Sequence, residues 1–432
     1  MNDGKDTRVD RRGFLGVATA AAGVTILKPS LVWGSQANSA VRLGVLGCGG
    51  RGRNVAASFL EHTNAVVTAI GDMFADQLEK GRAKLDEASA KHGKPAIDPS
   101  RIYRGPKAYQ ELFACKEVDA VYVATPPYFH PLHLEAAIAA GKHVYLEKPV
   151  AVDVPGAKKV KALGERAEGR LSLAVGFQIR HASPYVELVK RIHDGQIGRP
   201  VSGQVHYFAS RLKRPEWPEA TPPERRLRNW VYDRVLSGDV IVEQNVHILD
   251  VTNWVLKAHP LKAVGSGGRA GRTDHGDCWG HFNCVYTWPG DVHVSFASTQ
   301  FGEAAWGVGM QYYGTKGCAE ARYDAPVRIS GETEWEYPGL QVEPADPALA
   351  ATGTFRGALD DADPNKQKAF VDGIASGRFL DELADGAESA LAGILGRTAA
   401  YTGKTVTWEK LLRSKEVFDP KMDWDQFART AG

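Results

Sequence analysis

A glycine cluster is the first feature of this sequence that could do chemistry. Gly47-Cys48-Gly49-Gly50-Arg51-Gly52 follows the apolar run Val41 to Leu46 and precedes a segment with helical periodicity. Its spacing fits G-x-G-x-x-G, whose glycines allow a tight turn, close approach of the backbone to a pyrophosphate and close packing of a helix on a strand. The free N–H groups at the start of that helix favour anions. The cluster therefore predicts a dinucleotide-binding loop, with a glycine-rich surface turn as the alternative.

An acidic residue stands at the distance that this motif requires. Asp72 comes 20 residues after Gly52, directly behind the β-branched run Ala65 to Gly71. A carboxylate there binds ribose hydroxyls and repels a 2′-phosphate. We therefore expect NAD in preference to NADP, although Arg51 and Arg53 favour an extra phosphate.

A second set of polar residues follows the later strands of the same region. Thr125, Pro126 and His130 come after the strand-like residues 119–124, and Glu147 and Lys148 come directly after the strand-like residues 143–146. Ligands of doubly wound sheets lie beyond the carboxyl ends of the strands. We expect these residues at the cofactor, and Lys148 at a substrate held beside the nicotinamide. A solvated surface lysine is the alternative.

Two kinds of sequence pattern place these residues in an α/β protein of two domains. Strands and helices alternate from Val41 onward, which indicates a parallel sheet covered on both faces, a Rossmann NAD-binding domain at residues 41–153. Long alternating runs follow at residues 204–208, 281–287 and 292–301. They predict a large, mostly antiparallel open sheet in a substrate-binding α/β domain at residues 154–432.

Several segments together resemble the Gfo/Idh/MocA family (glucose–fructose oxidoreductase, inositol dehydrogenase and rhizopine catabolism). The resemblance covers nearly the whole chain after residues 1–37. It rests on the segments Gly47 to Gly52, Ala124-Thr125-Pro126-Pro127 with His130, Glu147-Lys148-Pro149, Gly176 to Arg180, and Gly238 to His247.

The resemblance implies a reaction and roles for three residues. The reaction is hydride transfer between NAD(P) and a secondary alcohol of a sugar or cyclitol. Lys148 is implied to orient the reacting hydroxyl and help move its proton, and His247 to be the acid/base. Glu243 stands where the family usually has aspartate. Because residues 243 and 247 are four apart, we expect them on one face of a helix, with the carboxylate orienting the imidazole.

The same segment departs from the family pattern at three further positions. Asp239 occupies the second glycine of a Gly-Gly pair, and Gln244 and Asn245 replace small and apolar residues. These changes make the start of this helix more polar than the pattern predicts.

Other polar and aromatic residues are candidates for the substrate pocket or for a metal site. The candidate substrate-binding residues are Arg180, His181, Asn229, Trp230 and Gln300. A structural pair is the alternative for Arg180 and His181, and a buried core tryptophan is the alternative for Trp230. The cluster His275, Asp277, Cys278, His281 and Cys284 matches no standard zinc spacing, and strand alternation explains it, so we predict no metal. The five cysteines contain no C-x-x-C pair, and their odd number argues against a disulfide framework.

The first residues of the chain resemble an export signal. Arg11-Arg12 precede an uncharged stretch, Gly13 to Leu27, that is too short to span a bilayer comfortably. We expect a twin-arginine signal peptide at residues 1–37, a periplasmic or otherwise exported protein, and no stable membrane anchor after cleavage. An uncleaved hydrophobic helix in a cytoplasmic protein is the alternative. The net charge of +2 gives no case for nucleic acid.

Three functions fit these patterns. The first is an NAD-dependent sugar, glycoside or cyclitol dehydrogenase, including an oxidoreductase that oxidises one sugar and reduces another. The second is a glycoside hydrolase that retains its NAD and ends with no net oxidation, which suits a compartment without a free NAD pool. The third is a non-catalytic sugar-binding or nucleotide-sensing protein. The large open sheet favours a homodimer or homotetramer.

Overall fold

The computed structural model describes residues 40–212, 215–273, 276–301, 306–341 and 355–429. Residues Val41–Gly432 form one compact unit. The expected signal peptide at residues 1–37 lies outside the described residues. Within them, no helix combines the length and apolar character needed to cross a membrane.

The first sheet is parallel and has six strands in the order β3-β2-β1-β4-β5-β6. Its strands are β1 Arg42–Leu46, β2 Val66–Asp72, β3 Ile102–Arg104, β4 Ala120–Val123, β5 His143–Leu146 and β6 Leu173–Val175. The connecting helices are α2 Gly50–His62, α3 Ala75–Lys91, α4 Ala108–Ala114, α5 His130–Ala139 and α6 Val154–Ala167. The order of strands reverses between β1 and β4, where ligands of such sheets bind.

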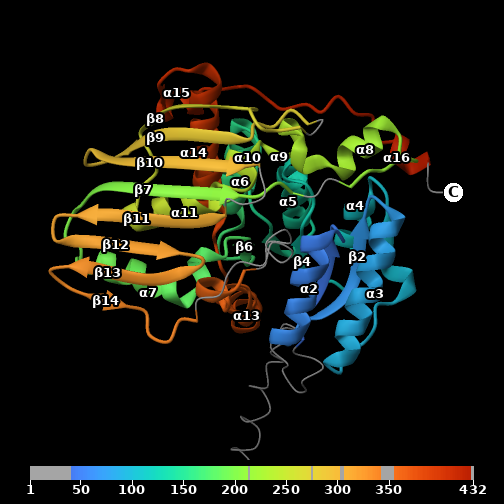
Figure 1. Cartoon of the computed structure of the whole chain (residues 1–432). Helices are drawn as coiled ribbons and strands as arrows, with labels where there is room; N and C mark the ends of the chain where they lie inside the picture. Colours follow the sequence, from blue (N-terminus) through green and yellow to red (C-terminus); the bar gives the residue numbers. More distant parts are fainter. Residues whose placement is uncertain (1–39, 213–214, 274–275, 302–305, 342–354, 430–432) are drawn as a thin grey trace, which may run out of the picture. The chain divides into compact units, whose positions relative to one another are not determined.

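The second sheet has nine strands and is antiparallel except where β7 pairs with β10 (Figure 1). In spatial order its strands are β14 Trp335–Glu336, β13 Ala325–Gly331, β12 Gly317–Arg322, β11 Gly307–Gly314, β7 Pro200–Ala209, β10 Val292–Gln300, β9 His281–Trp288, β8 Lys262–Gly268 and β15 Val406–Thr407. This arrangement confirms the predicted fold class.

One face of the second sheet is packed and the other is open. Helices α7 Ser183–His193, α11 Val246–Leu256 and α14 Leu383–Thr402 pack against it. Along β9 and β10 buried and exposed residues alternate, as expected for a half-buried strand. Val264 and Val285 are among the large apolar residues that stay exposed, at 45% and 41%.

A helix from the last third of the chain packs against a helix that covers the first sheet. Helix α13, Ala362–Ser376, packs on α2, and its Phe370 joins the aromatic rings of Phe59 and Tyr145 in a buried cluster. The first sheet also continues past residue 153, because β6 pairs with β5. The hydrophobic core around this sheet is therefore built from both ends of the compact unit.

All five cysteines are free. Cys278 and Cys284 are buried within the apolar core of the second sheet.

Candidate functional site

The glycine loop joins β1 to α2 and leaves bare backbone at the helix start. Gly47 has φ +95°, and a Cβ there would lie 2.6 Å from the carbonyl oxygen of Ala124. A Cβ on Gly52 would lie 1.8 Å from the carbonyl oxygen of Gly47. By contrast, a Cβ on Gly49 or Gly50 would meet nothing within 4 Å. The first and last glycines are required by packing, and the middle pair opens a cradle that fits a pyrophosphate.

Asp72, the last residue of β2, holds this loop in place. Its Oδ2 accepts a hydrogen bond from Cys48 N at 2.7 Å, and its Oδ1 accepts one from Phe74 N at 2.9 Å. Burial raises the pKa of Asp72 to about 6, although the two backbone donors lower it. The carboxylate is thus ionised at neutral pH. In this form it can accept hydrogen bonds from ribose hydroxyls and repel a 2′-phosphate.

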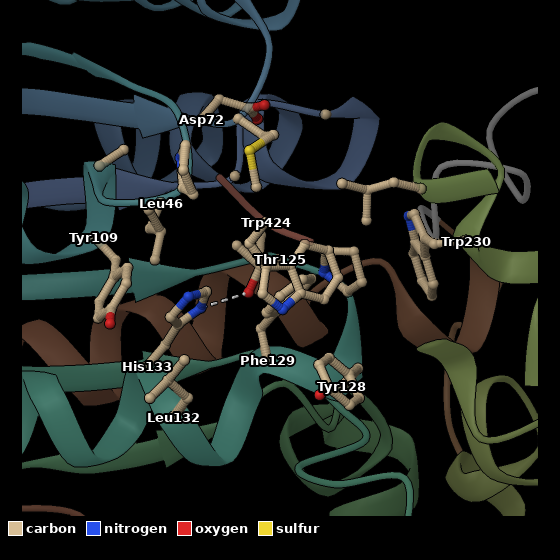
Figure 2. A pocket seen from close by; sticks show the side chains of 18 of the residues that line it. Leu46, Asp72, Tyr109, Thr125, Tyr128, Phe129, Leu132, His133, Trp230 and Trp424 are labelled. Atoms are coloured by element: carbon tan, nitrogen blue, oxygen red, sulfur yellow. Dashed lines mark hydrogen bonds between the residues drawn. The ribbon is translucent and has the colours of Figure 1, made fainter. Parts of the chain in front are cut away.

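A cavity of about 870 Å³ lies beside the loop and Asp72 (Figure 2). One wall comes from the first sheet, and its residues include Gly47, Gly49, Gly50, Asp72, Thr125 and Pro126. Later parts of the chain also line the cavity, and their aromatic residues are Trp217, Trp230, Phe418 and Trp424. The cavity has the size and the mainly apolar lining of a ligand or cofactor site, and the glycine loop and Asp72 on its wall suit a dinucleotide.

The histidines after β4 have different roles from the one that the sequence suggested. His130 is fully buried, and its ring nitrogens lie 2.8 Å from the carbonyl oxygen of Thr125 and 2.7 Å from that of Pro149. It joins the loops after β4 and β5, and it does not line the cavity. His133 does line it, with Nδ1 3.0 Å from Oγ1 of Thr125.

Arg51 and Glu147 face each other. Arg51 Nε lies 2.9 Å from Glu147 Oε1, and its Nη1 lies 3.0 Å from Oδ2 of Asp363 on α13. Tyr122 Oη donates to the same Glu147 oxygen at 3.0 Å. These two predicted cofactor residues thus have protein partners that tie the glycine loop to the end of β5 and to α13.

Lys148 and Glu243 form the centre of a second polar group. Lys148 Nζ donates to the carbonyl oxygen of Glu243 at 2.7 Å and lies 3.2 Å from its Oε1. The two side chains are 14% and 15% exposed, so a small molecule can still reach them.

His247 is buried next to these residues and carries no charge at neutral pH. Burial lowers the pKa of His247 well below its usual value, and the positive charge of Lys148 lowers it further. Its Nδ1 has no hydrogen-bond partner among the described residues. A neutral imidazole in this position can accept a proton.

The expectation of one helix carrying Glu243 and His247 is wrong. Glu243 ends α10, Val240–Glu243, and His247 lies in the first turn of α11, Val246–Leu256, with Gln244 and Asn245 at the break. The carboxylate of Glu243 pairs with Lys148, whereas no described residue is a hydrogen-bond partner of His247 Nδ1. Asn245 is also fully buried, and neither side-chain polar atom has a partner within the described ranges.

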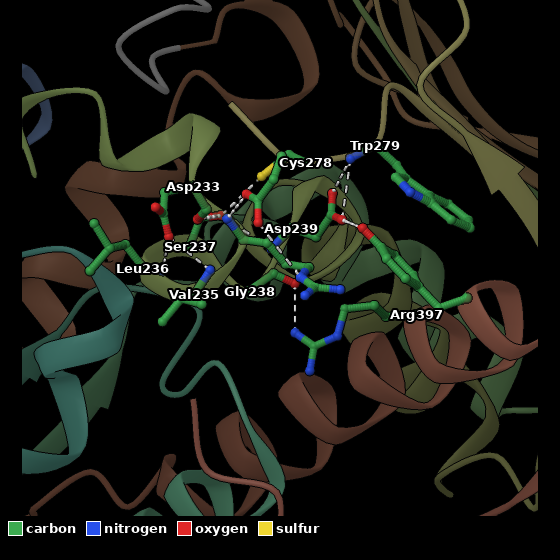
Figure 3. A network of polar contacts seen from close by, with 12 residues as sticks. Asp233, Val235, Leu236, Ser237, Gly238, Asp239, Cys278, Trp279 and Arg397 are labelled. Carbon is green, nitrogen blue, oxygen red and sulfur yellow. Dashed lines mark hydrogen bonds and ion pairs between the residues drawn. The ribbon is translucent and has the colours of Figure 1, made fainter. Parts of the chain in front are cut away.

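Asp239 occupies a backbone conformation that normally requires glycine. Its φ of 74° and ψ of 161° follow the φ of 87° at Gly238. The buried carboxylate accepts hydrogen bonds from Val240 N at 2.7 Å, Trp279 N at 3.1 Å and Tyr401 Oη at 2.7 Å (Figure 3). The departure from the Gly-Gly pattern therefore supplies a polar anchor at the start of α10.

The predicted substrate residues fall in three places. Arg180 pairs with Asp250 at 2.9 Å and Asp385 at 2.7 Å, and His181 lies 3.1 Å from Glu382, so these two have carboxylate partners. Gln300 is buried and donates to Oε1 of Gln244 at 3.3 Å, which places it near the break after Glu243.

The remaining two predicted substrate residues, Asn229 and Trp230, are neighbours in the sequence. Trp230 lines the dinucleotide cavity, and Asn229 donates to the carbonyl oxygen of Arg225 at 3.1 Å. The structure brings Lys148, Glu243 and His247 together, but it does not bring all the predicted substrate residues to them.

No cluster of three potential metal-ligating side chains occurs among the described residues. His275 of the cluster considered above lies outside them. Asp277 accepts a hydrogen bond from Arg234 N at 2.7 Å, and Cys278 lies 3.6 Å from Ser237 Oγ.

Comparison with known proteins connects this geometry to enzymes. A family model described as "Oxidoreductase family, NAD-binding Rossmann fold" matches residues 41–176, and one described as "GFO/IDH/MocA C-terminal domain" matches residues 185–320. A 1,5-anhydro-D-fructose reductase of Ensifer adhaerens is 28% identical over 285 residues, which is 63% of this chain and 78% of the reductase.

A glycosidase and a solved dehydrogenase extend the comparison. A glycosyl hydrolase family 109 protein of Streptomyces coelicolor is 28% identical over 172 residues, 40% of this chain, and the match spans only about a third of that relative (35%). The structure of levoglucosan dehydrogenase in complex with NADH and levoglucosan superimposes with a TM-score of 0.63 at 18% identity, covering 85% of this chain and 99% of that one. This last likeness is one of fold.

Proposed function

Because the chain belongs to the Gfo/Idh/MocA family of NAD-binding oxidoreductases, we propose that it acts on a secondary hydroxyl of a sugar, glycoside or cyclitol by hydride transfer. Its cofactor is NAD. The observation that carries the proposal is the group formed by Lys148, Glu243 and a neutral His247, an ammonium, a carboxylate and an imidazole at the end of β5 and the break after α10.

The protein's own groups supply the binding site for the cofactor. The bare backbone at Gly49 and Gly50 suits the pyrophosphate, and the carboxylate of Asp72 suits the adenosine ribose. A bound NAD would supply the acceptor for a hydride from the carbon that carries the reacting hydroxyl.

Proton transfer falls to the polar group. The ammonium of Lys148 has three donors, of which Glu243 takes two, so one is left to orient a substrate hydroxyl oxygen. His247 is neutral and accepts the hydroxyl proton. Glu243 keeps the lysine in position from both its main chain and its side chain.

The second candidate is a glycoside hydrolase that retains NAD and returns the hydride after the aglycone has left. Two observations favour it. The cavity is lined by aromatic residues from later parts of the chain that would lie over a dinucleotide held at the glycine loop, and one relative is a glycosyl hydrolase family 109 protein.

One experiment separates the two candidates. The protein is purified without added nucleotide and denatured, and the released NAD(H) is measured. Native protein is then offered free sugars, cyclitols and aryl glycosides, while aglycone release and reduced cofactor are followed. Accumulation of NADH from added NAD and a free sugar or cyclitol supports the dehydrogenase. Aglycone release without net NADH, by protein that holds NAD, supports the glycosidase, and no reaction with any class contradicts both.

We further propose export through the twin-arginine pathway and self-association. The adjacent Arg11-Arg12 support export, and a reporter fused to residues 1–37 should stay in the cytoplasm when both arginines are replaced by lysine. The exposed apolar residues Val264 and Val285 on the open sheet face support a homodimer or homotetramer. Val285→Glu should lower the mass measured by light scattering.

A further inference from the structure

The C-terminal segment, residues 413–429, runs from the second sheet to the dinucleotide cavity. It begins after α15, Trp408–Leu412, which follows the edge strand β15 of the second sheet. It continues without regular structure and ends in α16, Gln426–Arg429, close to α8, Pro222–Arg228 (Figure 1). The segment buries Phe418 and Phe427, which are 8% and 5% exposed.

Specific contacts hold this segment in place along its path. Phe418 N donates to Oδ2 of Asp153 at 2.8 Å, while the other oxygen of Asp153 caps α6. Arg226 of α8 donates to the carbonyl oxygen of Pro420. The guanidinium of Arg397 lies 4.5 Å above the ring of Phe418. These anchors come from α6, α8 and α14, so the segment has a defined position.

Two rings of the segment bridge the loops of the dinucleotide site. Trp424 lies 5.0 Å from Phe129, centroid to centroid, and 6.2 Å from Phe427. Phe427 in turn lies 6.2 Å from Phe74 in an edge-to-face contact. Phe74 is two residues after Asp72, and Phe129 is four residues after Thr125. The row of rings therefore joins the ribose-binding loop to the loop after β4, and Trp424 itself lines the cavity (Figure 2).

Helix α8 adds a second contact to the same loop. The guanidinium of Arg228 lies 3.8 Å from the centre of the Phe74 ring and 4.5 Å from that of Trp217. It also pairs with Asp76 of α3 at 2.9 Å. The ribose-binding loop is thus covered from two directions by parts of the chain that follow residue 200.

We infer that the C-terminal segment is a strap that retains NAD, with Trp424 as a cofactor-site residue. The strap supplies the outer wall of a cavity whose inner wall is the glycine loop and Asp72. A dinucleotide bound there leaves only after the contacts among Phe129, Trp424, Phe427 and Phe74 open. The inference rests on NAD binding in the proposed function, and it favours the retained-cofactor alternative over free exchange.

The test measures the release of NADH in the absence of any sugar. Full-length protein is loaded with NADH and mixed with excess NAD, and the loss of NADH fluorescence is followed by stopped flow. Trp424→Ala removes the central ring of the bridge with its contacts to Tyr128, Phe129 and Phe427. The loss of these three aromatic contacts corresponds to a release rate raised about tenfold or more. Trp335→Ala, a tryptophan on β14 that does not line the cavity, is the matched control and should release NADH as the unaltered protein does.

Two more results complete the test. Trp424→Phe keeps a ring in place and should remain close to the unaltered protein, which separates retention from general damage if the alanine variant is less stable. Equal release rates for Trp424→Ala and the unaltered protein would overturn the strap. Failure of the unaltered protein to bind NADH at all would instead overturn the cofactor site, and with it the proposed function.

Discussion

The ammonium of Lys148 donates to the carbonyl oxygen of Glu243 at 2.7 Å and lies 3.2 Å from the carboxylate of the same residue. Lys148 follows β5 of the first sheet, and Glu243 ends α10, so this contact joins two residues that are 95 positions apart in the sequence. A lysine held at both contacts has a fixed ammonium, which is what the orientation of a substrate hydroxyl requires.

Replacing Lys148 by methionine should abolish most turnover and leave the cofactor site intact. The variant loses the donor for the reacting hydroxyl, and we expect the turnover rate to fall by about 10²- to 10⁴-fold. NADH binding should persist, because Lys148 does not line the dinucleotide cavity. Fluorescence titration and steady-state kinetics measure the two effects. Lys190→Met, at an exposed lysine of α7, is the control, and unchanged turnover in Lys148→Met would remove this residue from the reaction.

The acid limb of the pH–rate profile should report the burial of His247. Its pKa lies well below the usual value, so the imidazole stays neutral as the pH falls through about 6.5. Turnover should therefore be constant between pH 7 and 6.5. A rate at pH 6.5 that is only about half of the plateau rate at high pH would show an imidazole with an ordinary pKa and contradict this assignment. His247→Asn should lower turnover at every pH.

Asp72 should make the discrimination between NAD and NADP depend on pH. Its pKa of about 6 means that the carboxylate is charged above pH 6 and progressively neutral below it. The charged form repels a 2′-phosphate, so the ratio of the NADP to the NAD dissociation constant should be large at pH 8 and smaller at pH 5. Asp72→Asn serves as the control, because any pH dependence that it retains belongs to the 2′-phosphate itself. Identical pH dependence in both proteins would contradict the prediction.

The parts of the site that the sequence predicted well are local. The glycine loop and Asp72 lie within 26 residues, from Gly47 to Asp72, and both depend on strands and helices that short patterns define. The alternation of apolar residues likewise predicted the β9 and β10 strands within one or two residues of their ends. The loop and the strands depend on local backbone conformation, which neighbouring residues in the sequence determine.

The parts that the sequence could not predict depend on distant partners. Arg51 pairs with Asp363, and Arg180 pairs with Asp250 and Asp385, so their charges are used inside the protein. Trp424 contacts Phe129, although the two residues are far apart in the sequence. No periodicity or short motif encodes such contacts, because they form only when the whole chain has folded.

The break between α10 and α11 shows a different limit of prediction from residue spacing. A spacing of four residues predicts a shared helix face only if one helix runs through both positions. Here Asn245 N bonds to the carbonyl oxygen of Val240, five residues back, and the helix divides at Gln244 and Asn245. Gln244 and Asn245, the polar residues at this break, are two of the positions at which the sequence departs from the family pattern.

Substitutions at Asp239 should separate backbone strain from lost hydrogen bonds. Asp239→Ala keeps a Cβ at φ 74° and loses the contacts to Trp279 N and Tyr401, whereas Asp239→Gly loses the same contacts without the strain. We expect both variants to be less stable than the unaltered protein, and the alanine variant to be less stable than the glycine variant by about 1 kcal/mol. Urea unfolding measures both differences. A glycine variant no more stable than the alanine variant would mean that the conformation carries no strain.

Replacing Gly49 or Gly52 of the glycine loop by alanine should affect different properties, cofactor affinity in the first case and stability in the second. Gly49 has φ −65°, and its added Cβ meets nothing within 4 Å, so Gly49→Ala should fold and unfold like the unaltered protein. The methyl group would project into the open cradle, where it crowds the pyrophosphate, and NADH affinity should fall by about tenfold or more. Gly52→Ala places its Cβ 1.8 Å from the carbonyl oxygen of Gly47, so the turn must shift and the folded state should lose about 1–3 kcal/mol or more. Thermal unfolding with and without NADH separates the two cases. A Gly49→Ala protein that binds NADH normally would show that the pyrophosphate does not lie against this backbone, and would move the cofactor away from the helix start.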